Sequence, residues 1–299
     1  MNLVVVGTLA FDSIETPYDR RERILGGSAT YFAHAARYFG AVGLVGVVGK
    51  DFPRGAMEDF RDRNIDTRGV EELEGKSFFW AGRYEADWNT RHTLDTQLNV
   101  FSNFDPKLPQ GYREASFLFL ANAEPAVQLR SLEQVRSPDL VVADTMNLWI
   151  DSKRGDLEGL LRRVHGLVLN DEEARMLSGR RNLFQAARAI LDLGPRFLVL
   201  KKGEHGAFLL GEDLRFALPA YPVEEVVDPT GAGDAFAGGF MGSLASAGSV
   251  DAATLRRAML YGTVTASFCV EGFGVERLAN LDRARVETRF QELKQFTTP

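Results

Sequence analysis

A glycine-rich turn followed by an aspartate is the stretch of this sequence best suited to chemistry. Residues 226–239 read VVDPTGAGDAFAGG, so that Gly231, Ala232 and Gly233 precede Asp234. A helix that begins in such a turn presents unpaired backbone N–H groups and a partial positive charge, and both favour a bound anion. A carboxylate beside an anion site is suited to act as a base. The pattern therefore predicts a phosphate-handling turn with Asp234 as its base.

Two purely structural interpretations of the same turn remain open. An aspartate in a first helical turn often only stabilises the helix, and Gly-Ala-Gly often only forms a tight turn. Two nucleotide-binding motifs are excluded by their spacing. Phe236 stands where G-x-G-x-x-G requires its third glycine, and G-x-x-x-x-G-K-S/T does not occur in the chain.

The turn must be held by the elements on either side of it. Asp228 precedes a proline, which disfavours helix, so the apolar run before it is predicted to be strand-like and to end there. After Asp234, apolar residues recur at every fourth position and would share one helix face: Phe236, Phe240 and Leu244. Glycines in the same segment would let this helix pack closely: Gly238, Gly239 and Gly242.

Patterns typical of buried strands alternate with helical patterns along most of the chain. Strands are predicted at residues 3–6, 42–48, 117–121, 140–143, 166–169 and 197–200. Helices are predicted at residues 26–39, 55–62, 127–136, 157–164, 255–270 and 281–296. This alternation favours an α/β fold, in which ligands bind at the carboxyl ends of the strands.

The segment between residues 76 and 101 departs from that alternation. Residues 77–84 and 90–96 are rich in aromatic and β-branched side chains, and residues 87–89 between them are typical of a hairpin turn. Strands without an intervening helix do not fit a βαβ layout, so the segment predicts a small antiparallel lid. A lid would keep water from a phosphoryl group in transfer. An edge hairpin without a gating role is the alternative.

Composition limits the classes of function. The 299 residues carry a formal net charge of −6, which argues against nucleic-acid and anionic-membrane partners because these need clustered positive charge. We find no apolar run of the roughly 20 residues that would span a bilayer, and no signal-peptide pattern. The single cysteine, Cys269, excludes an internal disulfide and favours a reducing compartment, so a cytoplasmic location is expected. The four histidines lack zinc-site spacing.

Several motifs together resemble the ribokinase-like carbohydrate kinases of the PfkB family. The stretch from Asp228 to Gly239 looks like the second signature of that family. Gly26-Gly27 resembles the first signature, with Tyr31 at the usual asparagine position. Further along, Asn170-x-x-Glu173 and Lys201-x-Gly203-x-x-Gly206 are similar to its nucleotide motifs. The resemblance implies an α/β, ribokinase-like three-layer sandwich with a mostly parallel central sheet, forming a single domain over residues 1–299 with a small β lid from about residues 9–25 and 76–100.

The resemblance also implies roles for individual residues. Asp234 would be the catalytic base, and the amides of Gly231, Ala232 and Gly233 would form an anion hole. The acceptor would be bound by Asp12, Gly26, Gly27 and Tyr31. The nucleotide, ATP, would be bound by Asn170, Glu173, Lys201, Gly203 and Gly206, with Thr263, Ser267 and Gly274 as weaker candidates. Mg²⁺ would be held by Asn170 and Glu173, partly through water, and a monovalent cation such as K⁺ by Asp228 and Thr230. Asp144 and Asn147 would face the same cleft.

The implied activity is transfer of the γ-phosphoryl group of ATP to a hydroxyl of a small sugar or sugar-like acceptor. Polyols and nucleosides stay open as acceptors, since an aromatic Tyr31 could stack on a sugar or on a base. A nucleoside kinase of the same fold is the first alternative. A non-catalytic nucleotide or metabolite sensor is an alternative of another class. The expected partner is the small-molecule acceptor. A homodimer through the lid is a further expectation from the resemblance, since family members are often dimers through the lid.

Overall fold

The computed structural model describes residues 1–297, so the last two residues of the predicted single domain lie outside the described part. Its larger sheet has nine strands. Their spatial order is β13 (Arg215–Leu218), β12 (Ala207–Gly211), β11 (Phe197–Lys201), β10 (Gly166–Asn170), β9 (Leu140–Asp144), β8 (Phe117–Leu120), β1 (Leu3–Val6), β4 (Val42–Gly49) and β5 (Ile65–Leu73). The strands from β5 to β11 pair in parallel, and β12 and β13 add antiparallel pairs at one edge. The predicted α/β fold with a mostly parallel sheet is confirmed.

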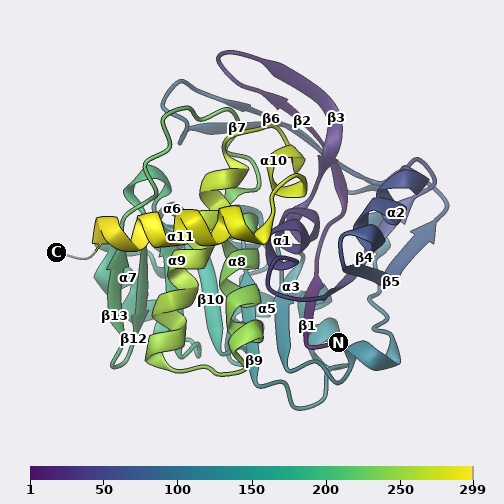
Figure 1. The fold of residues 1–299 in the computed structure, drawn as a ribbon. Helices are drawn as coiled ribbons and strands as arrows, with labels where there is room; N and C mark the ends of the chain where they lie inside the picture. The colour runs from purple at the N-terminus through teal and green to yellow at the C-terminus, as the bar shows by residue number, and fades with distance from the viewer. Residues whose placement is uncertain (298–299) are drawn as a thin grey trace.

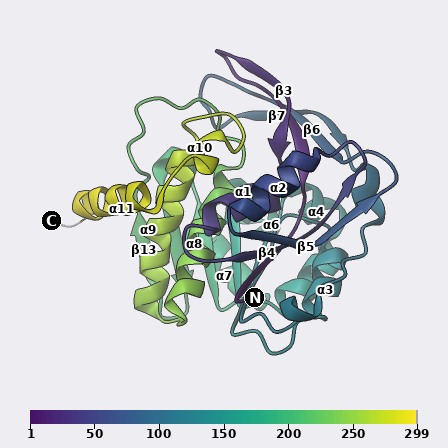
Figure 2. The same ribbon diagram turned by 45° about the vertical axis from the view of Figure 1, so that its right-hand side comes forward.

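Helices cover both faces of this sheet because its central strands are apolar on both faces. One core contains Val5 and Phe119 together with α1 (Ser28–Ala36), α2 (Arg54–Asp62), α8 (Ala232–Ala247), α9 (Ala252–Cys269), α10 (Glu276–Ala279) and α11 (Arg283–Thr297). The other contains Val4 and Leu118 together with α3 (Pro125–Leu132), α4 (Asn147–Ser152), α5 (Arg154–Leu161), α6 (Asp171–Ser178) and α7 (Leu183–Leu191). Figure 2 shows α8 and α9 on one side and α3 on the other. None of the helices within residues 1–297 combines the length and the apolarity that crossing a membrane requires.

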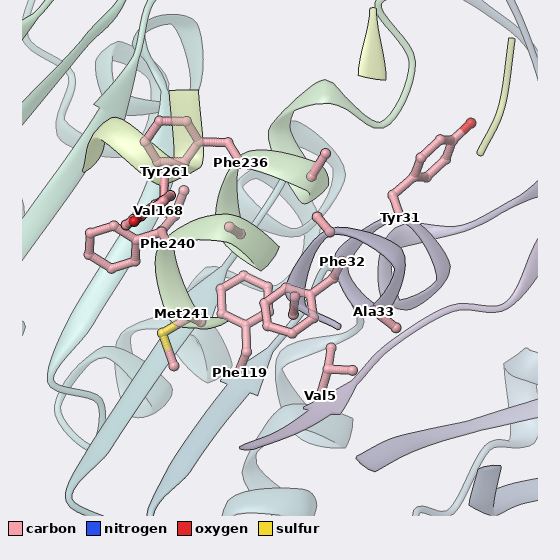
Figure 3. Packing of buried hydrophobic residues seen from close by; sticks show 14 of the residues in the cluster. Val5, Tyr31, Phe32, Ala33, Phe119, Val168, Phe236, Phe240, Met241 and Tyr261 are labelled. Atoms are coloured by element: carbon pink, nitrogen blue, oxygen red, sulfur yellow. The ribbon is translucent and has the colours of Figure 1, made fainter. Parts of the chain in front are cut away.

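The helix α8 packs unusually closely between α1 and α9. A Cβ atom at Gly238 would lie 2.3 Å from the carbonyl oxygen of Phe32 in α1. A Cβ atom at Gly239 would lie 2.2 Å from Oγ1 of Thr265 in α9. Beneath this contact the rings of Phe32 and Phe119 stack with centroids 4.6 Å apart (Figure 3). The glycines therefore fix the position of α8, and with it the position of the turn at its N-terminus.

A second, four-stranded sheet lies across the end of the central sheet at which β1 ends (Figure 1). Its order is β3 (Arg20–Gly26), β2 (Ala10–Glu15), β6 (Phe78–Tyr84) and β7 (Arg91–Gln97). The predicted hairpin is present, since β6 and β7 pair antiparallel. The sheet as a whole is mixed rather than antiparallel, because β2 enters directly from β1 and pairs parallel to β6.

The apolar run before the glycine-rich turn is not a strand. No strand occurs within residues 219–230, and the backbone N–H groups of Val227 and Asp228 donate instead to the carbonyl oxygen of Val270, at 2.8 and 3.2 Å. This segment contains Pro219, Pro222 and Pro229, which lack the N–H group that a ladder requires. The prediction of a strand there was therefore wrong, and Val270, the C-cap of α9, supplies the acceptor instead.

Other element boundaries differ by a few residues. The predicted helices at 127–136 and 157–164 are α3 and α5, which begin two and three residues earlier. Three short 3₁₀ segments complete the part of the chain that the structure describes: η1 (Asn99–Asn103), η2 (Gln110–Tyr112) and η3 (Gly203–His205).

We expect Gly238→Ala to destabilise the fold, since its methyl group would meet a backbone oxygen that cannot rotate away. Overpacking of this kind costs about 1–3 kcal/mol. Gly159→Ala in α5 is the matched control, because no atom lies within 4 Å of its Cβ position, and alanine there should stabilise the helix by about 0.5–1 kcal/mol. Urea unfolding measures both changes. A Gly238→Ala protein as stable as the wild type would contradict the close α1–α8 contact.

Candidate active site

A cavity of about 1190 Å³ lies between the four-stranded sheet and the central sheet. Trp80 and Arg91 line it from the smaller sheet, and Asp144 and Lys201 line it from the ends of β9 and β11. The carboxyl ends of parallel strands are the usual ligand site of open α/β sheets. The volume exceeds the roughly 300–1,000 Å³ of typical ligand pockets, so there is room for two ligands side by side.

The cavity brings together most of the residues predicted for the site. They are Asp12, Gly27, Tyr31, Asp144, Asn147, Asn170, Glu173, Lys201, Gly203, Gly206, Thr230, Gly231, Ala232, Gly233, Asp234, Thr263 and Ser267. Three of the predicted residues do not line it: Gly26, Asp228 and Gly274. Gly26 still lies behind Asp12, since a Cβ atom there would be 1.9 Å from the Asp12 carboxylate. Proximity does not assign roles, so the roles stay predictions.

The N-terminus of α8 opens into this cavity. Gly231 is the N-cap, and its φ of +76° is a left-handed conformation that favours glycine. The N–H group of Ala232 donates to the carbonyl oxygen of Pro229 at 3.2 Å. The N–H groups of Gly231 and Gly233 have no acceptor within residues 1–297. Of the three amides predicted to bind an anion, two are therefore available in this conformation.

A cluster of carboxylates surrounds one lysine beside this turn. Nζ of Lys201 lies 3.7 Å from the Asp144 carboxylate, and a Cβ atom at Gly233 would be 2.7 Å from the same Nζ. Burial raises the pKa of Asp234 to about 7, with a further rise from Asp144 and an opposing effect of Lys201. Burial also raises the pKa of Glu173 to about 7 against the effect of Lys201.

The lysine in this cluster stays charged. Burial lowers the pKa of Lys201, but the negative charges of Asp144, Glu173 and Asp234 outweigh it and hold the pKa above its ordinary value. Burial raises the pKa of Asp144 in spite of the lysine. Three carboxylates thus share one cation, and the cluster keeps an excess of negative charge that a bound cation or a proton would balance.

Asp12, which is predicted to bind the acceptor, lines the cavity together with Tyr31. Burial raises the pKa of Asp12 to about 7, Asp228 and Asp234 add to the rise, and a hydrogen bond from the N–H group of Gly27 opposes it. The hydroxyl of Tyr31 donates a long hydrogen bond of 3.5 Å to the Asp12 carboxylate. The Tyr31 ring points away from the Phe32–Phe119 pair, as Figure 3 shows.

Tyr31 also supports the glycine-rich turn. A Cβ atom at Gly231 would lie 2.3 Å from its ring, so the ring packs directly against the N-cap of α8. The side chain is only 1% exposed as a result. Little of the ring is left to stack on an acceptor, while its hydroxyl reaches Asp12 and its ring lies against Gly231.

Asn170 and Glu173 form a capping box at the start of α6. The Asn170 side chain accepts a hydrogen bond from the N–H group of Glu173 at 2.8 Å, and the Glu173 carboxylate accepts one from the N–H group of Asn170 at 2.7 Å. The two residues therefore have a structural role, because they cap the N-terminus of α6. Both side chains nevertheless line the cavity, and Oε1 of Glu173 has no hydrogen-bond partner among residues 1–297.

The donor set suits Mg²⁺ that is bound mainly by a nucleotide. The part of the chain that the structure describes holds no group of three or more His, Cys, Asp or Glu side chains able to hold a metal ion. Mg²⁺ in phosphoryl-transfer sites usually takes one or two protein carboxylates and completes its shell with phosphates and water. The free oxygen of Glu173 and the neighbouring Asp144 fit that arrangement.

Asp228 is a buried carboxylate below the turn. Its oxygens accept hydrogen bonds from the N–H groups of Thr230 at 2.8 Å and of Gly274 at 3.4 Å. Burial raises its pKa to about 6, and these bonds oppose the rise. No basic side chain of residues 1–297 lies within 4.0 Å of it. A small cation would compensate this charge, so the position fits a monovalent-cation site.

Two residues of the smaller sheet reach the site and were not singled out from the sequence. Oγ1 of Thr230, next to the glycine-rich turn, donates to the hydroxyl of Tyr84 at 3.3 Å. Arg91 lies 5.7 Å from the Trp80 ring centroid, and its charge lowers the pKa of Asp234 and of Glu173. Their position at the two strand ends beside the predicted hairpin turn is the signal that could have identified them.

The chain matches the pfkB family of carbohydrate kinases over residues 2–281. The cytidine kinase of Thermococcus kodakarensis is 31% identical over 246 residues, which cover 81% of this chain and 87% of that protein.

Solved structures agree with the fold. The nucleoside kinase of Burkholderia thailandensis in complex with inosine has a TM-score of 0.80 at 20% identity and covers 97% of this chain and 98% of its own. The nucleoside kinase of Methanocaldococcus jannaschii is described as an archaeal member of the ribokinase family. It has a TM-score of 0.77 at 21% identity and covers 98% of this chain and 99% of its own. At these identities the similarity shows the ribokinase fold alone.

We expect Asp234→Asn to stabilise the protein at pH 8. The folded-state pKa of about 7 lies above the usual 3.8, so the ionised carboxylate destabilises the fold above pH 7, and this cost shrinks as the pH falls towards 4. The gain at pH 8 should be roughly 2–4 kcal/mol. Exposed Asp213→Asn is the control, with a change within about 0.5 kcal/mol. Denaturant unfolding at several pH values tests this, and a gain independent of pH would contradict burial as its cause.

Proposed function

The chain belongs to the pfkB family of carbohydrate kinases, and from this premise we propose that it transfers the γ-phosphoryl group of ATP to a hydroxyl group of a nucleoside. The observation that carries the proposal is that Asp234, at the N-terminus of α8, and Asp12, in β2 of the smaller sheet, line the same cavity. An acceptor oriented by Asp12 would have a hydroxyl within reach of Asp234. The names of the relatives, a cytidine kinase and nucleoside kinases, favour a nucleoside.

Asp234 would act as the base. The acceptor oxygen attacks the γ-phosphorus, the bond from that phosphorus to the oxygen bridging it to the β-phosphate breaks, and ADP leaves. The hydroxyl proton passes to the Asp234 carboxylate. A pKa of about 7 suits this step, since the carboxylate is ionised at slightly alkaline pH and still basic enough to take a proton.

Charge on the transferred group would be stabilised from two sides. The free N–H groups of Gly231 and Gly233 point from the helix N-terminus, and the Lys201 ammonium lies against Gly233. Arg91 approaches from the smaller sheet, and among residues 1–297 no carboxylate lies within 4.0 Å of its guanidinium. These groups are held in place before the reaction, so little reorganisation would be needed during it.

The smaller sheet would act as a lid over the acceptor. Its Tyr84 lines the cavity and joins Ile14 and Phe273 in a separate apolar cluster, which would keep water from this side. A water molecule excluded in this way cannot compete for the phosphoryl group. Aromatic side chains contribute much of the lining and suit a flat, partly apolar base: Phe78, Trp80, Tyr84, Trp88, Phe101 and Trp149.

Two cations belong to the proposal. Mg²⁺, held with the nucleotide by Glu173, Asp144 and, through water, Asn170, would neutralise phosphate charge. K⁺ beside Asp228 and Thr230 would balance the buried carboxylate below the turn. Equal turnover in potassium and tetramethylammonium buffers would contradict the K⁺ site, and full turnover in excess EDTA would contradict the Mg²⁺ site.

A homodimer through the lid is the remaining part of the proposal. Every residue of the edge strand β7 is exposed in the single chain, including the apolar side chain of Leu94. An exposed edge strand is a surface on which a second strand can pair. Sedimentation at micromolar concentrations would show about twice the chain mass, and a monomer at all concentrations would exclude this interface.

The first kinetic prediction concerns the base. Asp234→Asn should lower kcat by about 10²–10⁴-fold, because the amide cannot accept the acceptor proton. The dissociation constant of ATP should change by only a few-fold, since the substitution alters little volume. Coupled ADP release and calorimetric ATP binding measure the two effects. Near-normal turnover in a folded Asp234→Asn protein would contradict the proposal that Asp234 is the base.

The second kinetic prediction concerns the acceptor class. The nucleobase of the acceptor would contact the aromatic walls of the cavity. The kcat/KM for the best nucleoside should therefore exceed that for free ribose and for fructose by about 10²-fold or more. ADP release with each acceptor measures this. A higher value for a free sugar would exclude the nucleoside assignment and leave a sugar kinase. No ADP release with any acceptor would favour the non-catalytic sensor.

A further inference from the structure

The side-chain amide of Asn122, two residues after the end of β8, is held in one orientation. Its Oδ1 accepts a hydrogen bond from the indole N–H group of Trp149 at 3.0 Å, and its Nδ2 lies 3.1 Å from the sulfur of Met146. An indole nitrogen can only donate, and a thioether sulfur can only accept. Flipping the amide would therefore place two donors face to face and lose both contacts. Trp149 is itself only 9% exposed, so it cannot easily turn away.

Asn122 lies at the acceptor end of the cavity. It lines the cavity, and its backbone carbonyl oxygen accepts a hydrogen bond from Oγ of Ser28 at 3.4 Å. Ser28 follows Gly27, whose N–H group bonds to the Asp12 carboxylate. The rings of Phe78 and Phe101, in edge contact at 5.9 Å, line the same cavity. A planar group attached to an acceptor at Asp12 would thus meet both an apolar wall and the Asn122 amide.

The fixed amide has one donor and one acceptor left for a ligand. Nδ2 has a second hydrogen beyond the one directed at Met146, and Oδ1 has a second lone pair beyond the one used by Trp149. This pair matches a base edge that carries an amino group next to an unprotonated ring nitrogen. Cytosine and adenine have such an edge. Uracil and hypoxanthine present a carbonyl group next to an N–H group, which requires the flipped amide.

We propose that Asn122, held by Trp149 and Met146, reads the base of the acceptor and selects amino-bearing bases over their keto counterparts. The inference rests on the proposed nucleoside kinase activity and narrows its substrate class. A matched pair of hydrogen bonds between an amide and a base is worth about 1–3 kcal/mol of discrimination. Converted at 1.4 kcal/mol per factor of ten, this predicts a preference of about 5- to 150-fold.

The experiment compares nucleosides that share a ribose and differ only at this edge. We would measure kcat/KM by ADP release with Mg²⁺ and ATP for cytidine against uridine, and for adenosine against inosine. The wild type should prefer the amino member of each pair that it phosphorylates. The pair with the higher kcat/KM shows whether the site takes a pyrimidine or a purine. Equal or reversed preference would overturn the role of Asn122 while leaving the kinase proposal in place. No turnover of any nucleoside would overturn the proposed function, and the inference with it.

Two substitutions test the mechanism of selection. In Asn122→Asp the carboxylate still accepts from Trp149, but it repels the ring nitrogen of cytosine and accepts from the N–H group of uracil. The cytidine-to-uridine ratio of kcat/KM should fall at least tenfold. Trp149→Phe keeps Asn122 but releases its amide, so the same ratio should fall towards one through a gain with uridine. A loss of folding alone would not produce such a gain.

Asn103→Asp is the control, since Asn103 is exposed and outside the cavity, and its ratio should equal that of the wild type. Circular dichroism would show whether each variant is folded. If Asn122→Asp does not fold, the cytidine-to-uridine ratio of kcat/KM in Trp149→Phe tests the inference. A wild-type ratio in the folded variants would overturn the inference.

Discussion

Burial of negative charge in one cavity is the constraint on which the rest of this structure depends. Asp12, Asp234 and Glu173 all have their pKa raised to about 7 by removal from water, and Lys201 is the cation placed among the carboxylates around Asp144. Such a site destabilises the chain that carries it, because an ionised carboxylate is better solvated in water. The cost is tolerated where function needs a reactive group, and it is offset by packing elsewhere.

That packing also explains the precision of the site. The helix α8 is fixed by backbone-close contacts of Gly238 with α1 and of Gly239 with α9, and its N-terminus therefore presents Gly231 and Gly233 at a defined place. Tyr31 extends the same rigidity to Asp12, since its ring lies on Gly231 and its hydroxyl reaches the Asp12 carboxylate. The proposed base, the amides proposed to bind an anion and the carboxylate proposed to bind the acceptor are thus parts of one packed unit, while the smaller sheet contributes Tyr84 and Arg91.

Local patterns explain what could be predicted from the sequence. The turn and first helical residues around Asp234 lie within one contiguous motif, and apolar runs mark the buried strands. The α/β sandwich and the part of the cavity lining around Asp234 were therefore predictable. The strand predicted before Asp228 failed because the three prolines of residues 219–230 lack the N–H groups that a ladder requires. Contacts between distant segments could not be predicted: Thr230 and Tyr84 are 146 residues apart, and Asn122 and Trp149 are 27 apart. No local sequence pattern indicates that the two residues of either pair are in contact.

The central claim is that this cavity directs a phosphoryl group to an acceptor hydroxyl rather than to water. The most direct measurement follows the label from ATP carrying ³²P at its γ-phosphate, in the presence of Mg²⁺ and a nucleoside. The account predicts one labelled nucleoside monophosphate for each ADP formed, with little inorganic phosphate. Release of the label mainly as inorganic phosphate, or ADP formation that does not depend on the nucleoside, would contradict it.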